Sequence, residues 1–249
     1  INIQYVVYNN EVYVIEVNPR SSRTVPYISK VTGIPMVDIA TKIMLGETLQ
    51  SLGYKSGLYP KGKYVAVKVP VFSFEKLHDV DTLLGPEMKS TGEVLGIART
   101  FDEALYKGLL AAGYKMKHEG GVLVTVRDTD KQEVVPIVEK YEKLGFKIYA
   151  TAGTALTLNQ NMIAANTIRK IEEEEPNIMT LFDENKIDYI ITTSKKGRKP
   201  ERHSVQMRRR AVERSIVTMT ALDTANALAN SLMTNRSVND IELVDITTI

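Results

Sequence analysis

A carboxylate, an amide and two guanidinium groups lie close together near the start of the chain. Glu16 and Asn18 end an apolar run, and Arg20 and Arg23 follow. Side chains two residues apart on a strand share a face, so Glu16 and Asn18 can offer oxygens to one hard cation such as Mg²⁺. The arginines can form charge-assisted forks with phosphate or carboxylate oxygens. The spacing predicts part of a nucleotide-dependent phosphoryl-transfer site, although Glu-x-Asn alone also fits a solvated strand end.

A second set of polar residues follows predicted strands in the other half of the chain. Thr151 and Thr154 flank a glycine where a strand passes into a helix, and Lys131 and Lys170 lie near other strand–helix junctions. Hydroxyl residues end a further strand: Thr192, Thr193 and Ser194. Ligands of open α/β sheets bind beyond the carboxyl ends of strands, where free helix N–H groups favour anions. We expect a site for a phosphorylated ligand, while an ordinary threonine N-cap fits the spacing of Thr151 and Thr154 equally well.

Composition describes an ordinary globular chain that can hold one large domain or two smaller ones. It has 249 residues, 43% hydrophobic and 25% charged, with a net charge of +2 and no cysteine. This charge does not mark a nucleic-acid binder, and no apolar run reaches the length of a membrane span. The lack of cysteine excludes disulfides and fits a cytoplasmic protein. The chain opens on a strand-like run without methionine, which we interpret as a fragment of a larger protein.

The order of elements predicts two domains, 1–115 and 116–249. In the first we expect strands at 2–8, 11–17 and 63–72, and helices beginning near Thr24, Pro35 and Thr100. In the second, expected strands at 121–127, 146–150, 166–171, 187–193 and 241–246 alternate with helices at 130–143, 154–160, 177–185, 203–214 and 220–233. Such alternation predicts an α/β fold with a Rossmann-like parallel sheet and helices on both faces.

Two strings carry a family resemblance. Residues 14–26 resemble the metal-binding strand of the ATP-grasp fold in the large subunit of carbamoyl phosphate synthetase, and residues 83–96 resemble another string of that subunit. The second half resembles the regulatory domain of the same subunit, whose fold is shared with methylglyoxal synthase. The resemblance covers essentially the whole chain, in family order: the C-terminal part of the second ATP-grasp unit, then the regulatory domain.

The resemblance implies synthesis of carbamoyl phosphate from bicarbonate, ATP and ammonia, with ammonia channelled from a glutaminase small subunit. By this match Gln4, Glu16 and Asn18 ligate Mg²⁺ or Mn²⁺ bridging the ATP phosphates, and Arg20 and Arg23 hold phosphate and carbamate. The ATP-grasp lid and the nucleotide-clamping lysines are not among these residues. We therefore expect no catalysis by this chain alone.

The resemblance also implies a regulatory nucleotide site. Its residues are Thr125, Lys131, Thr151, Thr154, Lys170, Thr192, Thr193 and Ser194. Family members bind UMP there, or IMP in some cases. Thr192 replaces the usual asparagine and His203 stands where IMP-responsive members commonly have aspartate, so we expect UMP as the effector.

Strand register bears on Gln4. A two-residue turn at Asn9 and Asn10 would pair Gln4 with Ile15, on the opposite face from Glu16. A three-residue loop or a bulge would instead pair Gln4 with Glu16. We predict the longer loop.

Alternative functions remain. A phosphate-ligand lyase of the methylglyoxal synthase kind needs a carboxylate base, and residues 159–163 have none. A free-standing nucleotide sensor is also compatible with the second half. The basic runs at 195–199 and 206–210 lack the interleaved aromatic residues that single-strand stacking uses, so we interpret them as solvated. The sequence leaves open whether the parent serves pyrimidine synthesis alone or arginine synthesis as well.

Overall fold

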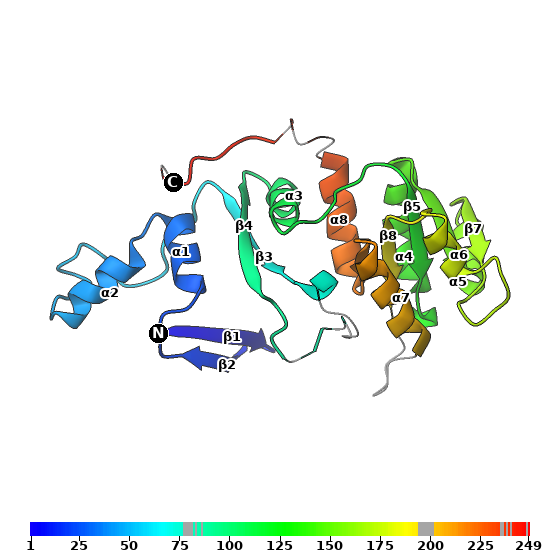
Figure 1. The fold of residues 1–249 in the computed structure, drawn as a ribbon. Coiled ribbons are helices and arrows are strands. Elements are labelled where there is room, and N and C mark those ends of the chain that lie inside the picture. The colour runs from blue at the N-terminus through cyan, green and yellow to red at the C-terminus, as the bar shows by residue number, and fades with distance from the viewer. Residues whose placement is uncertain are drawn as a thin grey trace. The chain divides into compact units, whose positions relative to one another are not determined.

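The computed structural model describes residues 1–76, 82, 84–85, 87–193, 202–234, 237, 239, 241–247 and 249 (Figure 1). Ser194 and the basic run at 195–199 lie outside these residues. The chain divides into two compact units, Ile1–Ala66 with Leu243–Ile249, and Val67–Glu242. The predicted division after residue 115 falls inside the second unit, and as a boundary between family domains it stays a prediction.

An antiparallel hairpin opens the first unit. Strands β1 (Asn2–Tyr8) and β2 (Glu11–Asn18) are joined by a two-residue turn whose φ angles are 49° at Asn9 and 61° at Asn10. Positive φ at both positions is typical of the type I′ turn, which matches strand twist. The predicted longer loop is therefore wrong. A register shift between Gln4 and Tyr5, the bulge considered as its alternative, pairs Gln4 with Glu16.

Two helices follow in the same unit. Helix α1 (Thr24–Thr32) ends at Gly33, where φ is 69°, and α2 (Met36–Met44) begins after Pro35. A Cβ at Gly33 would lie 2.6 Å from the carbonyl oxygen of Ile249. Gly33 is thus required both by the left-handed backbone and by the close approach of the chain's last residue.

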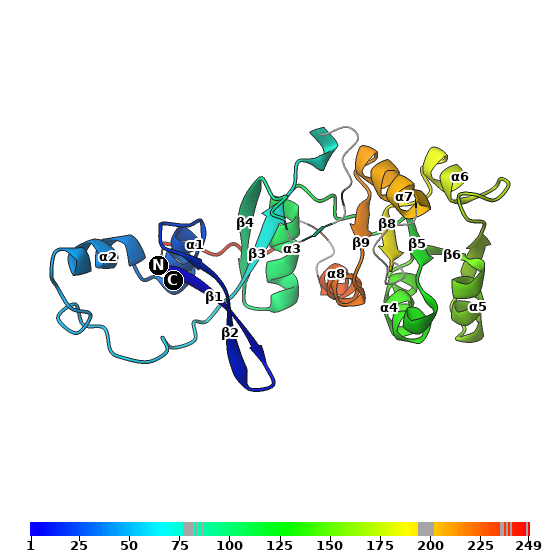
Figure 2. The same cartoon turned by 90° about the horizontal axis from the view of Figure 1, so that it is seen from below.

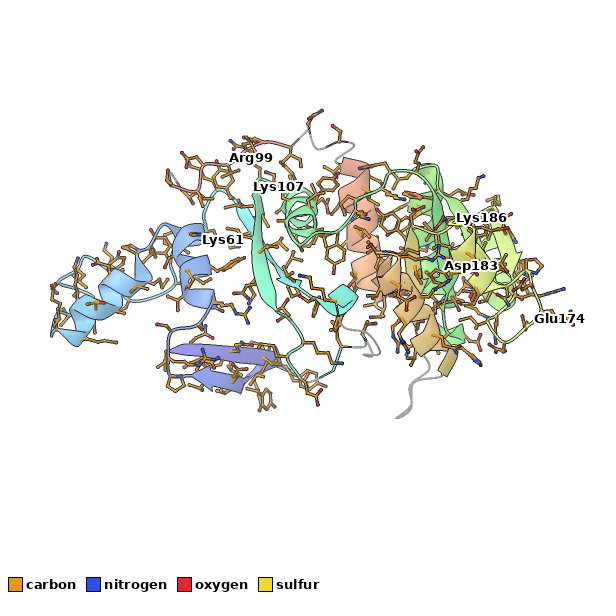
Figure 3. All side chains as sticks on the ribbon, viewed as in Figure 1. Lys61, Arg99, Lys107, Glu174, Asp183 and Lys186 are labelled. Carbon is orange, nitrogen blue, oxygen red and sulfur yellow. The ribbon has the colours of Figure 1, made fainter. Side chains whose placement is uncertain are left out.

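The first elements of the second unit form a strand pair covered by a helix. Strand β3 (Val65–Val71) pairs with β4 (Gly92–Ala98), the short 3₁₀ helix η1 (Phe74–Lys76) follows β3, and α3 (Phe101–Ala111) follows β4. The Lys107 ammonium of α3 donates to the Ile97 carbonyl at 3.0 Å and to the Glu242 carbonyl (Figure 3). These bonds attach the segment around Glu242 to this layer.

A five-stranded parallel sheet forms the rest of the unit. Its order is β7 (Ala165–Ile168), β6 (Lys147–Thr151), β5 (Gly121–Thr125), β8 (Tyr189–Thr192) and β9 (Val217–Met219). The predicted α/β class is confirmed. One strand was predicted wrongly: residues 241–246 form no strand, and β9 takes the edge position. Four of the six residues at 241–246 are apolar, but Leu243 is 92% exposed, so no sheet buries this segment.

Helices cover both faces of this sheet, as predicted (Figure 2). Helices α4 (Lys131–Lys143), α5 (Ala152–Gln160) and α8 (Leu222–Thr234) pack on one face with Val122 and Val124. Helices α6 (Ile178–Asp183) and α7 (Arg202–Glu213) pack on the other with Leu123. Asp183 joins these two helices through ion pairs with Arg210 at 2.8 Å and Arg214 at 3.2 Å (Figure 3). Alternate residues of each central strand thus serve two separate cores.

Within the described residues, no helix combines the length and the apolar character needed to cross a membrane.

Candidate functional site

The predicted metal ligands lie together on the β1–β2 hairpin. Gln4 is opposite Glu16 in the register, and the Asn18 amide donates to a Glu16 carboxylate oxygen. Opposed residues of an antiparallel pair face the same side, so the three side chains share one face. Among the described residues there is no cluster of three or more His, Cys, Asp or Glu that could hold a metal. This trio supplies one carboxylate and two amides, an oxygen set that suits a hard cation.

The two predicted phosphate-binding arginines lie just beyond the hairpin. Arg20 donates to the Ser21 carbonyl at 3.1 Å, and Arg23 occupies the N-cap position of α1 without a side-chain capping bond. Both arginines are exposed, and in the described part of the chain no hydrogen bond or ion pair joins them to Glu16 or Asn18. The structure therefore brings the predicted metal ligands together, while the two arginines form no described hydrogen bond or ion pair with them.

Four threonines meet at the carboxyl ends of the central strands. Thr125 lies opposite Thr192 in the parallel register of β5 and β8, and the Thr151 hydroxyl donates to the Thr125 hydroxyl at 3.5 Å. The amide of Thr193 continues the ladder by donating to the Thr125 carbonyl at 3.2 Å. Three adjacent strands thus deliver hydroxyl groups to one edge, where the sequence positions placed Thr151, Thr192 and Thr193 and the family resemblance placed Thr125.

Helix α5 begins at this edge with its capping position unused. Thr151 is the N-cap residue but makes no side-chain capping bond, because its hydroxyl is directed to Thr125. The first N–H groups of the helix are therefore not satisfied by that side chain. The helix begins at Ala152 rather than at Thr154, so Thr154 lies within its first turn. Its side-chain oxygen is buried and has no hydrogen-bond partner among the described residues.

Lys131 reaches the same helix end from the first residue of α4. A Cβ placed on Gly153 would lie 2.6 Å from the Lys131 ammonium, so the lysine side chain fills the space that the glycine leaves. The Lys131 ammonium also pairs with Asp128 at 2.7 Å, and the Lys131 side chain is 22% exposed. A partly buried ammonium, an uncapped helix N-terminus and hydroxyl groups form a cradle for an anion, which is where phosphate groups bind on many α/β sheets.

The sequence reasoning missed a buried carboxylate beside this cradle. Asp130 is 6% exposed, and its two carboxylate oxygens share the single Nε–H of Arg127, each 2.8 Å from Nε. It also accepts from the Thr129 hydroxyl at 2.9 Å, and the Thr193 hydroxyl lies close enough to affect its pKa. The Arg127 guanidinium, followed by these hydroxyls, holds the pKa of the Asp130 carboxyl below its usual value although burial opposes the shift. A signal was available: Asp130 directly precedes Lys131 at the expected start of a helix.

Lys170 is less closely connected to the cradle than the other candidates. It follows β7, the edge strand next to β6, and its backbone N–H donates to Glu173 at 2.8 Å. Its side chain is exposed, and no described bond joins it to Lys131 or to the threonines. Lys170 thus lies at the same edge of the sheet as the cradle, but no described bond joins it to the cradle residues.

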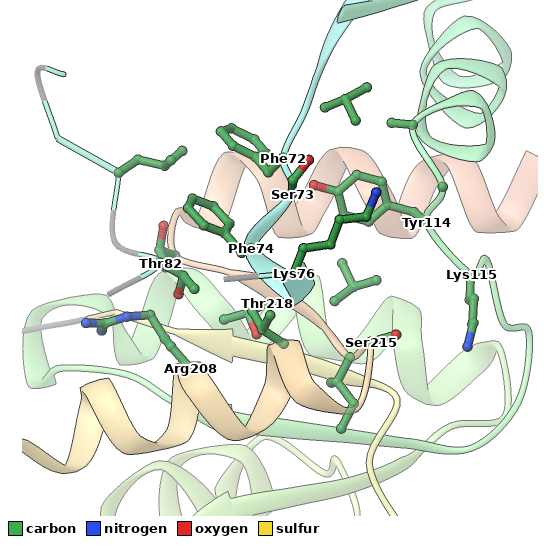
Figure 4. Close-up of a pocket in the computed structure, with 18 residues that line it drawn as sticks. Phe72, Ser73, Phe74, Lys76, Thr82, Tyr114, Lys115, Arg208, Ser215 and Thr218 are labelled. Atoms are coloured by element: carbon green, nitrogen blue, oxygen red, sulfur yellow. The ribbon is translucent and has the colours of Figure 1, made fainter. Parts of the chain in front are cut away.

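A separate cavity of about 390 Å³ lies elsewhere in the same unit (Figure 4). The rings of Phe72 and Phe74 on its wall stack at 5.2 Å with an interplanar angle of 7°. Burial raises the pKa of the Tyr114 phenol, and the Thr218 hydroxyl oxygen is buried without a partner in the described part of the chain. None of the strand-end threonines lines this cavity, so it is distinct from the anion cradle.

Comparison with known families assigns the two halves of the chain. Residues 1–52 match the ATP-binding domain of the carbamoyl-phosphate synthase L chain, and residues 133–220 match the MGS-like domain. The chain therefore combines part of an ATP-binding domain of this type with an α/β domain of the MGS-like class.

Similarity to curated proteins extends along nearly the whole chain. It is 51% identical over 246 residues, 99% of its length, to the carbamoyl phosphate synthase large chain of Lachnoclostridium phytofermentans. It is also 51% identical over 235 residues, 94% of its length, to that of Agathobacter rectalis. The chain belongs to the family of carbamoyl phosphate synthase large chains, as its sequence predicted. It spans 23% and 22% of the lengths of these two relatives.

Proposed function

We propose that this chain acts as part of a large subunit that makes carbamoyl phosphate in the cytoplasm from bicarbonate, ATP and ammonia supplied by a glutaminase small subunit. The matched ATP-binding segment and the two relatives named as synthase large chains support this assignment. In this role the chain contributes metal and phosphate ligands from its first unit and a nucleotide-binding domain from its second.

In the first unit, Gln4, Glu16 and Asn18 hold Mg²⁺ or Mn²⁺, and Arg20 and Arg23 bind phosphate and carbamate oxygens. The shared face of the three ligands and their oxygen chemistry support this role. A bound metal supplies neutralisation of phosphate charge during transfer. The arginines supply fixed positive charge and orient the substrates through paired hydrogen bonds.

In the second unit, the carboxyl edge of the sheet binds the phosphate of a regulatory nucleotide, UMP being our assignment. The observation that carries this proposal is the position of the Lys131 ammonium against Gly153 in the first turn of α5, where the next residue, Thr154, has a buried hydroxyl with no partner in the described part of the chain. Thr125, Thr151 and the end of β8 supply further hydroxyls. Ser194 and Lys170 complete the proposed set of ligands.

Calorimetric titration of the chain with UMP tests the regulatory assignment, with uridine and inorganic phosphate as controls. We expect saturable UMP binding that uridine does not reproduce. Lys131→Met should weaken UMP binding at least about tenfold, because it removes a charge-assisted contact. Lys143→Met is the matched control: it lies at the other end of α4 and pairs with Glu139 at 2.6 Å. Equal binding of UMP and uridine, or no effect of Lys131→Met, would reject the phosphate cradle.

A further inference from the structure

Asp130 is the most enclosed carboxylate around the cradle, and it holds a residue that bonds to the end of a neighbouring strand. Both of its carboxylate oxygens contact the Arg127 side chain, in the loop after β5, at 2.8 Å. The Arg127 backbone N–H donates at 3.1 Å to the hydroxyl of Thr193, which follows β8. Asp130, Arg127 and Thr193 therefore form a linked set of bonds, through Arg127, between the loop after β5 and the end of β8. We call this set the Asp130 clamp.

Asp130 does not make the helix-capping bond that its position would allow. It occupies the N-cap position of α4, where an aspartate side chain ordinarily accepts from the helix N–H groups. No such capping bond forms, and the carboxylate points instead to the clamp. A residue suited to helix capping instead holds Arg127, whose backbone N–H bonds to Thr193, 66 positions along the sequence.

We infer that Asp130 is a positioning residue, which fixes Lys131 and Thr193 relative to each other at the carboxyl edge of the sheet. Lys131 directly follows Asp130, and the Thr193 amide bonds to the Thr125 carbonyl, so the clamp connects to both sides of the cradle. The ionised carboxylate makes a charge-assisted contact with the Arg127 guanidinium, at 2.8 Å. This inference deepens the proposed function and rests on it for the identity of the ligand.

The test compares Asp130→Asn with Asp188→Asn in the 249-residue chain. Asp188 is a matched control, since its side chain is 11% exposed and joins the same two strands at their amino ends. It accepts from Lys117 at 2.6 Å and from the Gly121 amide at 3.0 Å. Both variants should lower the urea midpoint of unfolding. Only Asp130→Asn should weaken UMP and phosphate binding, by about tenfold, because only it loosens the carboxyl edge.

A double variant separates positioning from general destabilisation. If Asp130 acts through Thr193, adding Asp130→Asn to Thr193→Ala should weaken UMP binding far less than the product of the single effects. Additive effects, or equal losses in Asp130→Asn and Asp188→Asn, would overturn the inference. Unchanged UMP binding in Asp130→Asn would also overturn it, while leaving the cradle itself supported.

Hydrogen exchange at the Arg127 amide gives a readout that needs no ligand. We expect faster exchange there in Asp130→Asn and unchanged exchange in Asp188→Asn, since the amide donates to Thr193 within the clamp. If the unmodified chain binds neither UMP nor phosphate, the proposed function fails, and this exchange result alone decides whether Asp130 orders the edge. Exchange that is equal in all three proteins would then reject the positioning role.

Discussion

At the scale of single residues, Thr154 differs from the other groups of the cradle. It is 1% exposed, yet its hydroxyl oxygen has no partner among the described residues. Buried hydroxyls are ordinarily hydrogen-bonded, so this hydroxyl, beside an uncapped helix end, is available to a ligand. Thr157, one turn later in α5, differs because its hydroxyl donates to the Gly153 carbonyl at 3.2 Å. The two threonines provide a direct comparison.

Thr154→Val should weaken UMP binding about tenfold while leaving the free energy of unfolding unchanged or higher. The reason is that valine fills the same volume and removes a hydroxyl that is unsatisfied without ligand. Calorimetry and urea unfolding measure the two quantities. Thr157→Val is the control and should bind UMP normally. A large loss of stability in Thr154→Val with intact binding would make the hydroxyl structural.

At the scale of elements, the site depends on how closely α4 approaches the start of α5. Gly153 permits this approach, and its φ angle is not in the left-handed region, so the requirement is for space rather than backbone freedom. The clash that a Cβ would create is with the flexible end of Lys131, which can move away. A side chain at position 153 would therefore displace the Lys131 ammonium without disrupting helix α5.

Gly153→Ala should raise the urea midpoint slightly and weaken phosphate and UMP binding. Alanine favours a helix over glycine by up to about 1 kcal/mol, while its Cβ displaces the Lys131 ammonium from the helix end. Unfolding curves and calorimetry on the same protein samples measure both effects. Normal UMP affinity in Gly153→Ala would mean that the ligand does not use the lysine in this position.

Two buried tyrosines make the core of the second unit sensitive to alkali. Tyr141 of α4 donates to the Ala225 carbonyl of α8 at 3.0 Å, and Tyr189 of β8 donates to the Lys117 carbonyl at 2.9 Å. Burial raises the pKa of both phenols far above the ordinary value of 10.0. In the unfolded chain the same groups ionise near that ordinary value. Their contribution to stability is thus complete below pH 10 and is lost as the pH rises further.

The free energy of unfolding should fall between about pH 10 and pH 11, by about 1.4 kcal/mol per pH unit for each tyrosine. Urea unfolding at a series of pH values measures this slope. Tyr141→Phe should reduce the slope, whereas Tyr59→Phe, at a 59% exposed position in the first unit, should leave it unchanged. An identical slope in Tyr141→Phe would show that its phenol ionises in the folded state.

At the scale of the whole molecule, the two proposed sites lie in two compact units. The predicted metal ligands lie in the unit formed by Ile1–Ala66 and Leu243–Ile249, and the cradle lies in Val67–Glu242. The cradle is built on a sheet with a core on each face. The hairpin of the first unit has few buried side chains, and apolar residues such as Val7 and Ile15 are more than half exposed. We therefore expect the second unit to bind its nucleotide whether or not the first unit supports catalysis.

The chain alone should bind UMP but form no carbamoyl phosphate from ATP, bicarbonate and ammonia. Its match to the ATP-binding family covers residues 1–52, and it spans 23% of the length of a related large chain. Incorporation of labelled bicarbonate into trapped carbamoyl phosphate measures this activity, with Glu16→Gln as the control for contaminating enzyme. Synthesis that Glu16→Gln abolishes would show that the chain holds a complete site.

The sequence by itself determined the kinds of elements and the junctions at which polar groups emerge. Strand and helix periodicities are local, so the parallel α/β fold and the junctions that carry Lys131, Thr151 and Thr154 could be predicted from them, while Thr125 was named through the family resemblance. Predictions from local patterns failed where strand formation depends on pairing with a neighbouring strand. The three-residue strand β9 is too short to carry a periodicity, and the apolar-rich segment 241–246 pairs with no strand in the described part of the chain.

The tertiary structure decided the register and the bonding of side chains. Both a two-residue turn and a bulge were needed to oppose Gln4 and Glu16, and only strand pairing selects that combination. Asp130 has the sequence position of a helix cap but holds Arg127 instead, and Arg127 reaches Thr193, far along the chain, only when β5 and β8 pair. A carboxylate bonds to whichever donors the fold brings near it, and that choice is made by contacts that local sequence does not contain.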